Sequence, residues 1–488
     1  MLIAGSASTR VSAARSATLS KSALQCDVAV IGAGTAGLAA ERSARRSGAT
    51  TLLVDEAFSG TTCATVGCMP SKLLIAAAHT AHTIRRAPTF GIDAFPEING
   101  AAVMTRVQRE RDAFAAATRA EIEKLPQGIT VRGVARFAAE TTLSLEDGRL
   151  IHARAIVIAT GSRPSIPKAF EEIHDLVLTN ENVFELPRLP NTLAVIGAGP
   201  LGLELAQAFA RLGTDVSVLD EKDKLAAIED PEITAQLRAV FEKEFDLHLG
   251  VKIEAKRAGD SASISWTGAS TGRATFDRVL VAAGRPPDLK RLDLGATGLT
   301  LDKQGVPLFN RETMQCGDSA IFLAGDADAD RPVLHEALAT GAIAGHNAAT
   351  YPKVASTRRT VPLSIMFTDP PLATVGQHAD AGLITGQSAY QDQGRAKVEA
   401  RAQGLARLYA TRDTATLKGA LLFCPGADHL GHLLAWAIES GLDASTLLDR
   451  PFYHPTFEEG LKPALRQLCE TAGVAPPSAR DPGAPSGA

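Results

Sequence analysis

Several features that mark other classes of protein are scarce in this 488-residue sequence. No apolar run approaches the ~20 residues that a membrane-spanning helix needs. The net charge of −4 provides no electrostatic attraction to nucleic acid or to an anionic membrane. Six cysteines are too few for a disulfide scaffold in a chain of this length. The composition is therefore that of an ordinary globular protein, and the length predicts roughly three domains.

The two ends of the chain differ from the rest in composition. Residues 1–24 are rich in Ala and Ser and contain basic but no acidic residues. We favour a disordered extension and a cytoplasmic protein here, and the alternative is a transit peptide to the mitochondrial matrix. Residues 473–488 are rich in Pro, Gly, Ala and Ser, which predicts a disordered tail.

Residues 27–56 predict a strand, a glycine turn, a helix and a second strand. The turn contains Gly32, Gly34 and Gly37, and Asp55 ends the second strand. In such a motif the first glycine permits a tight turn. The second lets the backbone approach a pyrophosphate, and the third packs the helix against the strand. The helix N-terminus then faces the phosphates and Asp55 can accept hydrogen bonds from a ribose diol, so we predict a dinucleotide site.

Residues 193–221 repeat this pattern about 165 residues later, with Gly197, Gly199, Gly202 and Asp220. Two such units predict two dinucleotide-binding domains in one chain. An acid at Asp220 favours the free 2′-hydroxyl of NAD, because it would repel the 2′-phosphate of NADP. Two lysines that follow Asp220 could soften this preference, although simple solvation of both is the plainer interpretation.

Cys63 and Cys68 form the one close cysteine pair, in GTTCATVGCMPSK. A structural zinc site is an unsatisfactory explanation, because zinc needs four ligands and no second pair or Cys/His cluster is near. A buried reduced pair is possible, and a redox-active disulfide is the functional alternative. The next segment predicts a helix, so a thiolate at Cys68 would lie near a helix N-terminus and be stabilised there.

His454 and Glu459 lie in the segment FYHPTFEEG. A spacing of five residues does not place two side chains together on a helix. A turn at Pro455 could bring Glu459 back to orient the imidazole. The spacing alone leaves a purely structural histidine equally open.

Taken together, VIGAGTAG, CATVGCMPSK, AIVIATGSRP, VIGAGPLGLE, AAGRPPD, FLAGDAD and FYHPTFEEG resemble the pyridine-nucleotide disulfide oxidoreductase family, and most of all its lipoamide dehydrogenases. The resemblance implies an α/β fold with two Rossmann-like domains, for FAD and NAD, and a C-terminal α+β dimerisation domain. It also implies a homodimer. The expected boundaries are 25–158 for the FAD domain, 159–284 for the NAD domain, 285–350 for a central segment returning to the FAD domain and 351–472 for the dimerisation domain.

The resemblance also implies roles for the motif residues. Cys63 would be the interchange thiol that meets the substrate, and Cys68 the charge-transfer thiol that faces the flavin. His454, oriented by Glu459, would be the acid–base catalyst and would serve the cysteines of the other subunit. The remaining implied contacts are Lys72 with Glu204 (an ion pair beside flavin N5), Asp326 (the ribityl region of FAD), and Thr160, Gly161 and Gly284 at the dinucleotides.

The sequence departs from the family pattern around the substrate channel. Thr62 precedes Cys63 in a Gly-Thr-Thr-Cys run where Gly-Gly-Thr-Cys is frequent, and Thr65 stands where Asn is usual. Phe452 and Tyr453 replace the His-Ala that usually precedes His-Pro in lipoamide dehydrogenases. The predicted function is NAD-dependent oxidation of dihydrolipoyl groups on a lipoyl-bearing protein or a small dithiol. Glutathione-reductase-like or mercuric-reductase-like activity and a redox-sensing role are the alternatives.

Overall fold

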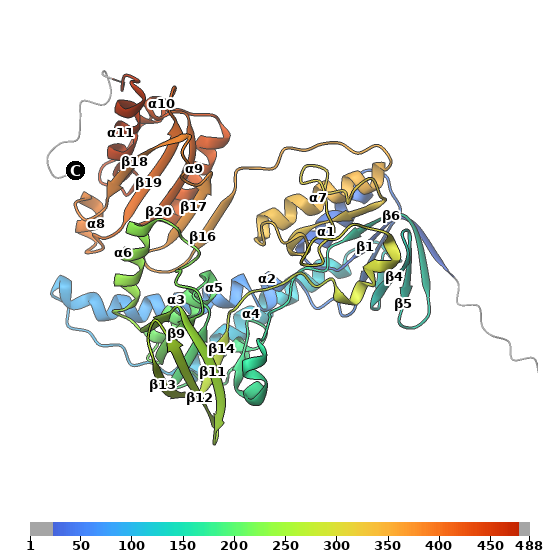
Figure 1. Ribbon diagram of the computed structural model, residues 1–488, viewed down its shortest axis with the longest axis horizontal. Helices are drawn as coiled ribbons and strands as arrows, with labels where there is room; N and C mark the ends of the chain where they lie inside the picture. The colour runs from blue at the N-terminus through green and yellow to red at the C-terminus, as the bar shows by residue number, and fades with distance from the viewer. Residues whose placement is uncertain (1–22, 478–488) are drawn as a thin grey trace, which may run out of the picture.

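A computed structural model describes residues 23–477 of the chain. The predicted extension and tail fall outside this range, apart from residues 23–24 and 473–477. Three units are arranged around two long helices, with the N-terminal unit on the right of Figure 1, the second unit at the bottom and the C-terminal unit at the upper left. Within residues 23–477, no helix is both long and apolar enough to cross a membrane.

The first unit contains a seven-stranded sheet in the order β3-β2-β1-β6-β5-β4, with β15 also paired to β6. The β1, β2, β3, β6 and β15 strands pair with one another in parallel, as in a dinucleotide-binding fold, whereas β4 and β5 are antiparallel to their neighbours. Helices α1 and α7 cover this sheet side by side (Figure 1). The bounds are β1 Leu24–Ile31, β2 Thr51–Asp55, β3 Thr130–Arg132, β4 Ala135–Ala139, β5 Thr142–Leu145, β6 Leu150–Ile158, β15 Ile321–Leu323, α1 Thr35–Arg46 and α7 Leu334–Thr350.

The second unit repeats the design with a parallel sheet in the order β10-β9-β8-β14-β7. A three-stranded antiparallel sheet, β11-β12-β13, extends from it and was not predicted from the sequence. The bounds are β7 Val177–Leu178, β8 Thr192–Ile196, β9 Asp215–Asp220, β10 Asp246–Leu249, β11 Val251–Ala258, β12 Ser261–Gly268, β13 Gly272–Phe276, β14 Arg278–Val281, α5 Pro200–Arg211 and α6 Pro231–Phe241.

Two long helices, α3 and α4, leave the first unit and pack against each other, and α3 also packs against α5 of the second unit (Figure 1). The helix predicted over 101–125 is α4, and the helix predicted after the cysteine pair is α3. Their bounds, with those of the short helix before them, are α2 Thr62–Thr65, α3 Cys68–Arg86 and α4 Gly100–Glu123. The short 3-10 helices are η1 Ala87–Phe90, η2 Lys168–Leu176, η3 Val183–Glu185, η4 Lys290–Leu292, η5 Leu294–Thr297, η6 Gly325–Asp328 and η7 Glu458–Leu461.

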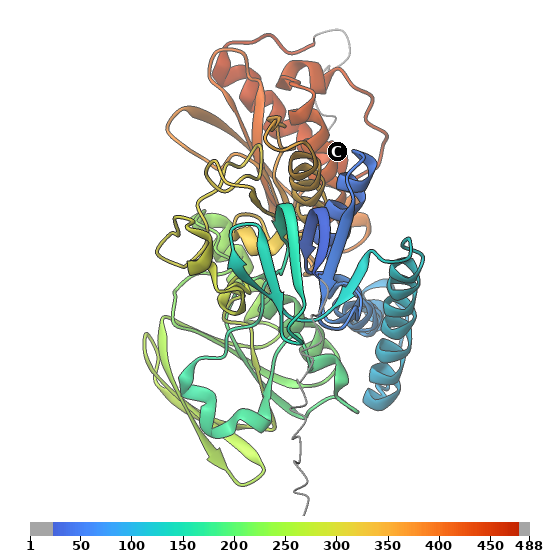
Figure 2. The ribbon, with the colours of Figure 1, turned by 90° about the vertical axis from the view of Figure 1, so that its right-hand side faces the viewer.

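The C-terminal unit is an antiparallel sheet in the order β16-β17-β20-β19-β18, with helices packed on it. Figure 2 shows it above the strands of the first sheet, with the second unit below. The arrangement confirms the predicted class, two Rossmann-type units followed by an α+β unit. The bounds are β16 Leu363–Met366, β17 Leu372–Gly376, β18 Leu383–Ala389, β19 Leu405–Thr411, β20 Leu417–Phe423, α8 Gly394–Val398, α9 Ala427–Glu439, α10 Ala444–Leu448 and α11 Lys462–Ala472.

Candidate active site

The two cysteines lie on consecutive helices. Cys63 belongs to the short helix α2, and Cys68 is the first residue of α3. The hydroxyl of Thr61 accepts the amide hydrogen of Ala64 at 3.4 Å and caps α2. Gly67 precedes α3 and provides no side-chain cap. The positive end of the long helix therefore points at Cys68, as the sequence predicts.

The environment separates the two thiols in acidity. A hydrogen bond between them, burial and the charge of Cys68 raise the pKa of Cys63 well above its ordinary range. The same hydrogen bond, donated by Cys63, and the ammonium group of Lys72 lower the pKa of Cys68, although burial opposes this shift. The pair therefore holds its negative charge on Cys68 and its proton on Cys63.

An ion pair joins this helix to the second unit. Lys72 Nζ lies 2.8 Å from Glu204 Oε2 on α5. The other carboxylate oxygen of Glu204 accepts the amide hydrogen of Phe367 at 2.8 Å, and the Phe367 ring lies 4.5 Å from Lys72 Nζ. One lysine, one turn beyond Cys68, is thus fixed by residues of two other units. The predicted contact between Lys72 and Glu204 is present.

A chain of hydrogen bonds holds the loop between the cysteines. Asn180 Nδ2 donates to the carbonyl oxygen of Val66 at 3.1 Å. Arg285 donates to Asn180 Oδ1 at 2.6 Å and to the carbonyl oxygen of Ser162 at 2.7 Å. The hydroxyl of Ser162 donates to Asp326 Oδ2 at 2.9 Å. Asp326 is therefore connected to the cysteine loop through Ser162 and Arg285, which lie in the motifs AIVIATGSRP and AAGRPPD, and through Asn180, which lies in no motif.

The first glycine turn has the shape that a dinucleotide requires. A Cβ atom on Gly37 would collide with the carbonyl oxygen of Gly32, so the helix can pack on the strand only without it. At Gly34, which precedes α1, a Cβ would meet nothing within 4 Å. Thr160 Oγ1 is buried and has no hydrogen-bond partner among residues 23–477, and Thr160 lies against Gly32. The turn is open toward a ligand and has an unused polar atom beside it, which fits FAD.

The second turn has the same construction. A Cβ on Gly202 would strike the carbonyl oxygen of Gly197, while one on Gly199 would meet open space. Gly161 and Gly284 lie where two segments cross between the first and second units. The amide of Asp288 donates to Gly161 O at 2.9 Å, and the amide of Ser165 donates to Gly284 O at 3.1 Å. The second turn fits a nicotinamide dinucleotide, NAD or NADP, and the crossing fixes the turns relative to each other.

Asp55 and Asp220, the last residues of β2 and β9, have a role beyond the predicted contact with a ribose. Asp55 Oδ2 accepts the amide hydrogen of Ala33 at 2.8 Å. Asp220 Oδ2 accepts the amide hydrogen of Ala198 at 2.7 Å in the equivalent position. Each carboxylate therefore fixes its own glycine turn. A carboxylate oxygen has more than one acceptor site, so a ribose hydroxyl remains compatible with this contact.

The turn after His454 brings the imidazole to Glu459. His454 Nδ1 lies 3.0 Å from Glu459 Oε2, and the His454 side chain is 62% exposed while that of Glu459 is 14% exposed. The amide of Thr456 donates to the same oxygen at 3.2 Å. Within residues 23–477 of a single chain, no hydrogen bond or ion pair joins His454 to either Cys63 or Cys68. The described part of the chain also has no cluster of three or more His, Cys, Asp or Glu side chains suited to a metal ion.

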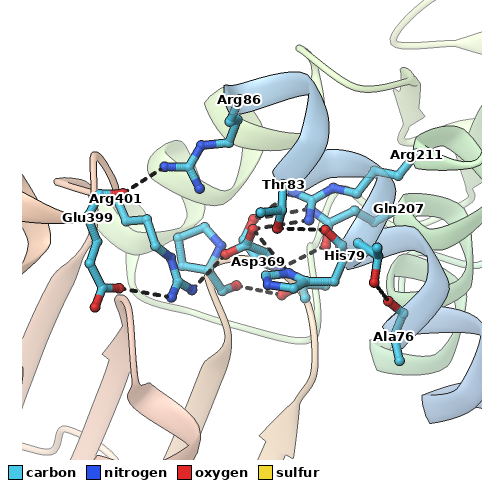
Figure 3. A network of polar contacts seen from close by, with 12 residues as sticks. Ala76, His79, Thr83, Arg86, Gln207, Arg211, Asp369, Glu399 and Arg401 are labelled. Atoms are coloured by element: carbon cyan, nitrogen blue, oxygen red, sulfur yellow. Dashed lines mark hydrogen bonds and ion pairs between the residues drawn. The ribbon is translucent and has the colours of Figure 1, made fainter. Parts of the chain in front are cut away.

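A buried ionic network joins the C-terminal unit to α3 and α5 (Figure 3). Asp369 lies at its centre and contacts Arg211 at 3.1 Å and Arg401 at 3.0 Å. Gln207 exchanges two hydrogen bonds with the backbone of Asp369, at 2.8 and 3.1 Å. Burial opposes ionisation of Asp369, but the two guanidinium groups prevail and lower its pKa to about 2. The network holds Phe367, two residues earlier, over Lys72, and it was not predicted.

Comparison with known proteins identifies the family. Residues 26–345 match the pyridine nucleotide-disulphide oxidoreductase family, and residues 362–465 match its dimerisation domain. Dihydrolipoyl dehydrogenase of Haloferax volcanii is 31% identical over 458 residues, which cover 90% of this chain and 95% of that protein. Mercuric reductase of Shigella flexneri is 33% identical over 460 residues, which cover 90% of this chain and 80% of the relative.

Solved structures share the fold. RclA of Escherichia coli, described as an HOCl-induced flavoprotein disulfide reductase, superimposes with a TM-score of 0.78 at 20% identity, covering 90% of this chain and 99% of RclA. LpdA of Mycobacterium tuberculosis has a TM-score of 0.77 at 24% identity, covering 91% of this chain and 99% of LpdA. With the glycine turns, the cysteine pair and both matched domains in one chain, the protein belongs to the pyridine nucleotide-disulphide oxidoreductase family.

Proposed function

We propose that the protein oxidises dihydrolipoyl-type dithiols with NAD+, through the Cys63–Cys68 pair and bound FAD. The observation that carries this proposal is the exposed His454 hydrogen-bonded to Glu459. Oxidation of a dithiol requires a base that removes a thiol proton, and a histidine oriented by a carboxylate is suited to that step. Relatives named dihydrolipoyl dehydrogenase at 31% identity add support.

The residues divide the chemistry among them. His454 accepts a proton from a substrate thiol, and the resulting thiolate attacks Cys63 of the disulfide, with Cys68 leaving as a thiolate. The second substrate thiol attacks the mixed disulfide, Cys63 departs as a thiol with the proton of that second thiol, and the proton taken by His454 is released to solvent. Lys72 stabilises the charge left on Cys68. Bound FAD would supply the two-electron acceptor between the thiols and NAD+.

We infer further that the functional unit is a homodimer. The C-terminal unit matches a dimerisation domain, and Trp436 and Tyr453 there are 64% and 83% exposed. Large aromatic side chains at such exposure favour burial against another subunit. A second copy would also provide His454 to a cysteine pair that it does not contact within its own chain.

NAD is the favoured coenzyme. The carboxylate of Asp220 lies at the end of β9, where it would repel a 2′-phosphate. Lys224 could have attracted that phosphate, but its ammonium group lies 2.9 Å from Glu229. Its charge is therefore already balanced.

Reduction of mercuric ion is the second candidate. Mercuric reductases at 32–33% identity support it, and the same cysteine pair would serve both reactions. Two observations weigh against it. A metal ion needs no base such as His454 to be reduced, and the one cysteine near the C-terminal end, Cys469, is buried. A mercuric reductase is expected to present an exposed cysteine pair for metal transfer.

The test is a parallel assay of the FAD-loaded protein. Dihydrolipoamide, glutathione disulfide and mercuric ion are each compared with the NAD and NADP coenzymes, in the wild type and in His454→Gln. We expect the highest kcat/KM with dihydrolipoamide and NAD+, and a large loss of that activity in His454→Gln. Faster mercuric ion reduction that His454→Gln leaves intact would replace the proposal with the metal reductase. Absence of turnover with all three substrates would favour the redox-sensing role.

A further inference from the structure

Two buried side chains hold the loop that carries His454 and Glu459. Tyr390 is fully buried, and its hydroxyl donates to the carbonyl oxygen of Phe457 at 3.0 Å. Gln393 is 6% exposed, and its Nε2 donates to the carbonyl oxygen of Thr456 at 2.7 Å. Both lie in the turn between β18 and α8, on the inner side of the loop. The carbonyl groups of Thr456 and Phe457 are therefore both held by hydrogen bonds from buried side chains.

Packing and hydrogen bonds hold both the Gln393 amide and the Tyr390 ring in one conformation. The Gln393 Oε1 atom accepts the amide hydrogen of Ala396 at 2.8 Å and caps α8. The amide is used at both ends, so a flip of the group would break both hydrogen bonds. The ring of Tyr390 lies against Gly460, where an added Cβ would approach the ring to 2.6 Å. The loop therefore rests on a closely fitted support.

The support acts on the acid–base pair through one residue, Thr456, whose carbonyl and amide groups lie in successive peptide planes. The carbonyl of Thr456 binds Gln393, and its amide donates to the Glu459 oxygen that also binds His454 Nδ1. The Thr456 hydroxyl donates to the carbonyl oxygen of Tyr453 at 2.8 Å and closes the turn. A displacement of the Thr456 backbone would therefore move the Glu459 carboxylate and the His454 imidazole together.

We infer that Gln393 and Tyr390 are positioning residues for the reaction with the dithiol, an inference that rests on the proposed function of His454. The imidazole is exposed and has Glu459 as its one described hydrogen-bond partner. Its placement relative to a cysteine pair is then set by the loop backbone. Because a misplacement of about 1 Å can cost roughly 100-fold in rate, the support beneath the loop determines how well the base reaches the thiol.

The experiment compares two activities of the same variants. Gln393→Glu keeps the acceptor for Ala396 but replaces the donor to Thr456 with a repelling oxygen. Tyr390→Phe removes one hydroxyl and keeps the ring. Gln391→Glu makes the same chemical change at an exposed position two residues away and is the matched control. Activity with dihydrolipoamide is measured beside NADH oxidation by ferricyanide, which needs neither the cysteines nor His454.

We expect kcat for dihydrolipoamide oxidation to fall by roughly 10- to 100-fold in Gln393→Glu and by roughly three- to tenfold in Tyr390→Phe. KM and ferricyanide activity should stay near wild type, while the melting temperature should fall by a few degrees, because each variant leaves a buried carbonyl without its donor. Gln391→Glu should behave as wild type. In the His454→Gln background, Gln393→Glu should cause little further loss, because both changes act through the same group.

The outcomes separate the two hypotheses. If the wild type does not oxidise dihydrolipoamide, the proposed function is wrong, and if His454→Gln leaves that oxidation intact, the role of His454 as its base is wrong. If His454→Gln abolishes it while Gln393→Glu and Tyr390→Phe do not affect it, the positioning inference is wrong. Equal loss of both activities would reduce the two residues to general structural support. A crystal structure of Gln393→Glu gives a substrate-independent check, since an unchanged 3.0 Å contact between His454 and Glu459 would overturn the inference.

Discussion

The clearest quantitative prediction concerns the ionisation of Cys68. The hydrogen bond from Cys63 and the charge of Lys72 lower its pKa from 9.0 to about 6. At pH 7 a thiol with a pKa of 9.0 would be about 1% thiolate, whereas one with a pKa of about 6 would be about 90% thiolate. Cys63→Ala removes the larger cause and Lys72→Met the second. We expect both variants to raise the pKa of Cys68, with the greater shift in Cys63→Ala.

The assay follows the thiolate directly. FAD-loaded protein is reduced without oxygen by a stoichiometric dithiol, and the long-wavelength absorbance of a thiolate beside the flavin is titrated from about pH 5 to about pH 9. In the wild type this absorbance should appear with a midpoint near 6, and Cys68→Ser should lack it. Cys26→Ser serves as the control, because burial raises the pKa of that thiol to about 12 and it should contribute nothing.

Two results would refute the reasoning. Loss of the absorbance in Cys63→Ser with retention in Cys68→Ser would show that the two thiols have been assigned in reverse. A wild-type midpoint near 9, unchanged in Lys72→Met, would show that neither the hydrogen bond nor the ammonium group controls the thiolate.

Three further predictions test the coenzyme, the dimer and the ionic network. Asp220→Arg should reduce the preference for NADH over NADPH, measured as the ratio of kcat/KM values, by removing repulsion and adding a phosphate partner; equal values in the wild type would contradict the assignment. Inactive Cys63→Ser and His454→Gln chains, dissociated and reassembled together, should regain up to about a quarter of wild-type activity, because half the dimers are mixed and each has one intact site. A verified mixed dimer without activity would place His454 outside a shared site. Asp369→Asn should lower the free energy of unfolding at pH 7 by about 2 kcal/mol. Since its pKa is lowered to about 2, this stabilisation is present above about pH 4, is lost as the pH falls toward 2, and the two proteins should converge there in chemical denaturation.

The parts of the site that the sequence could predict are local. The glycine turns and the helix after Cys68 follow from hydrophobic periodicity and from residues within one βαβ unit. The pairing of Lys72 with Glu204, 132 residues apart, was available only through the family resemblance. The hydrogen bond from Asn180 to Val66 spans 114 residues and had no signal, because an asparagine that holds a carbonyl has no characteristic spacing.

The missed elements have the same cause. In the small sheet β11-β12-β13, the first strand carries four charged residues and the third is only five residues long, so their hydrophobic alternation is weak. The middle strand does alternate polar and buried apolar residues, but its neighbours hide that signal. The network around Asp369 depends on how the C-terminal unit meets α5. No sequence pattern within either segment indicates that contact.

The departures from the family pattern fall into two physical classes. Thr65, between the cysteines, donates its hydroxyl to the carbonyl oxygen of Thr61 at 2.9 Å, so that substitution is satisfied within its own helical turn. Phe452 lies under the ammonium group of Lys462, which is 4.9 Å from its ring. Tyr453 is different, because it is exposed and immediately precedes His454. We therefore expect these substitutions to leave the chemistry of the two thiols unchanged. Discrimination between substrates is expected at the exposed surface of Tyr453, next to His454.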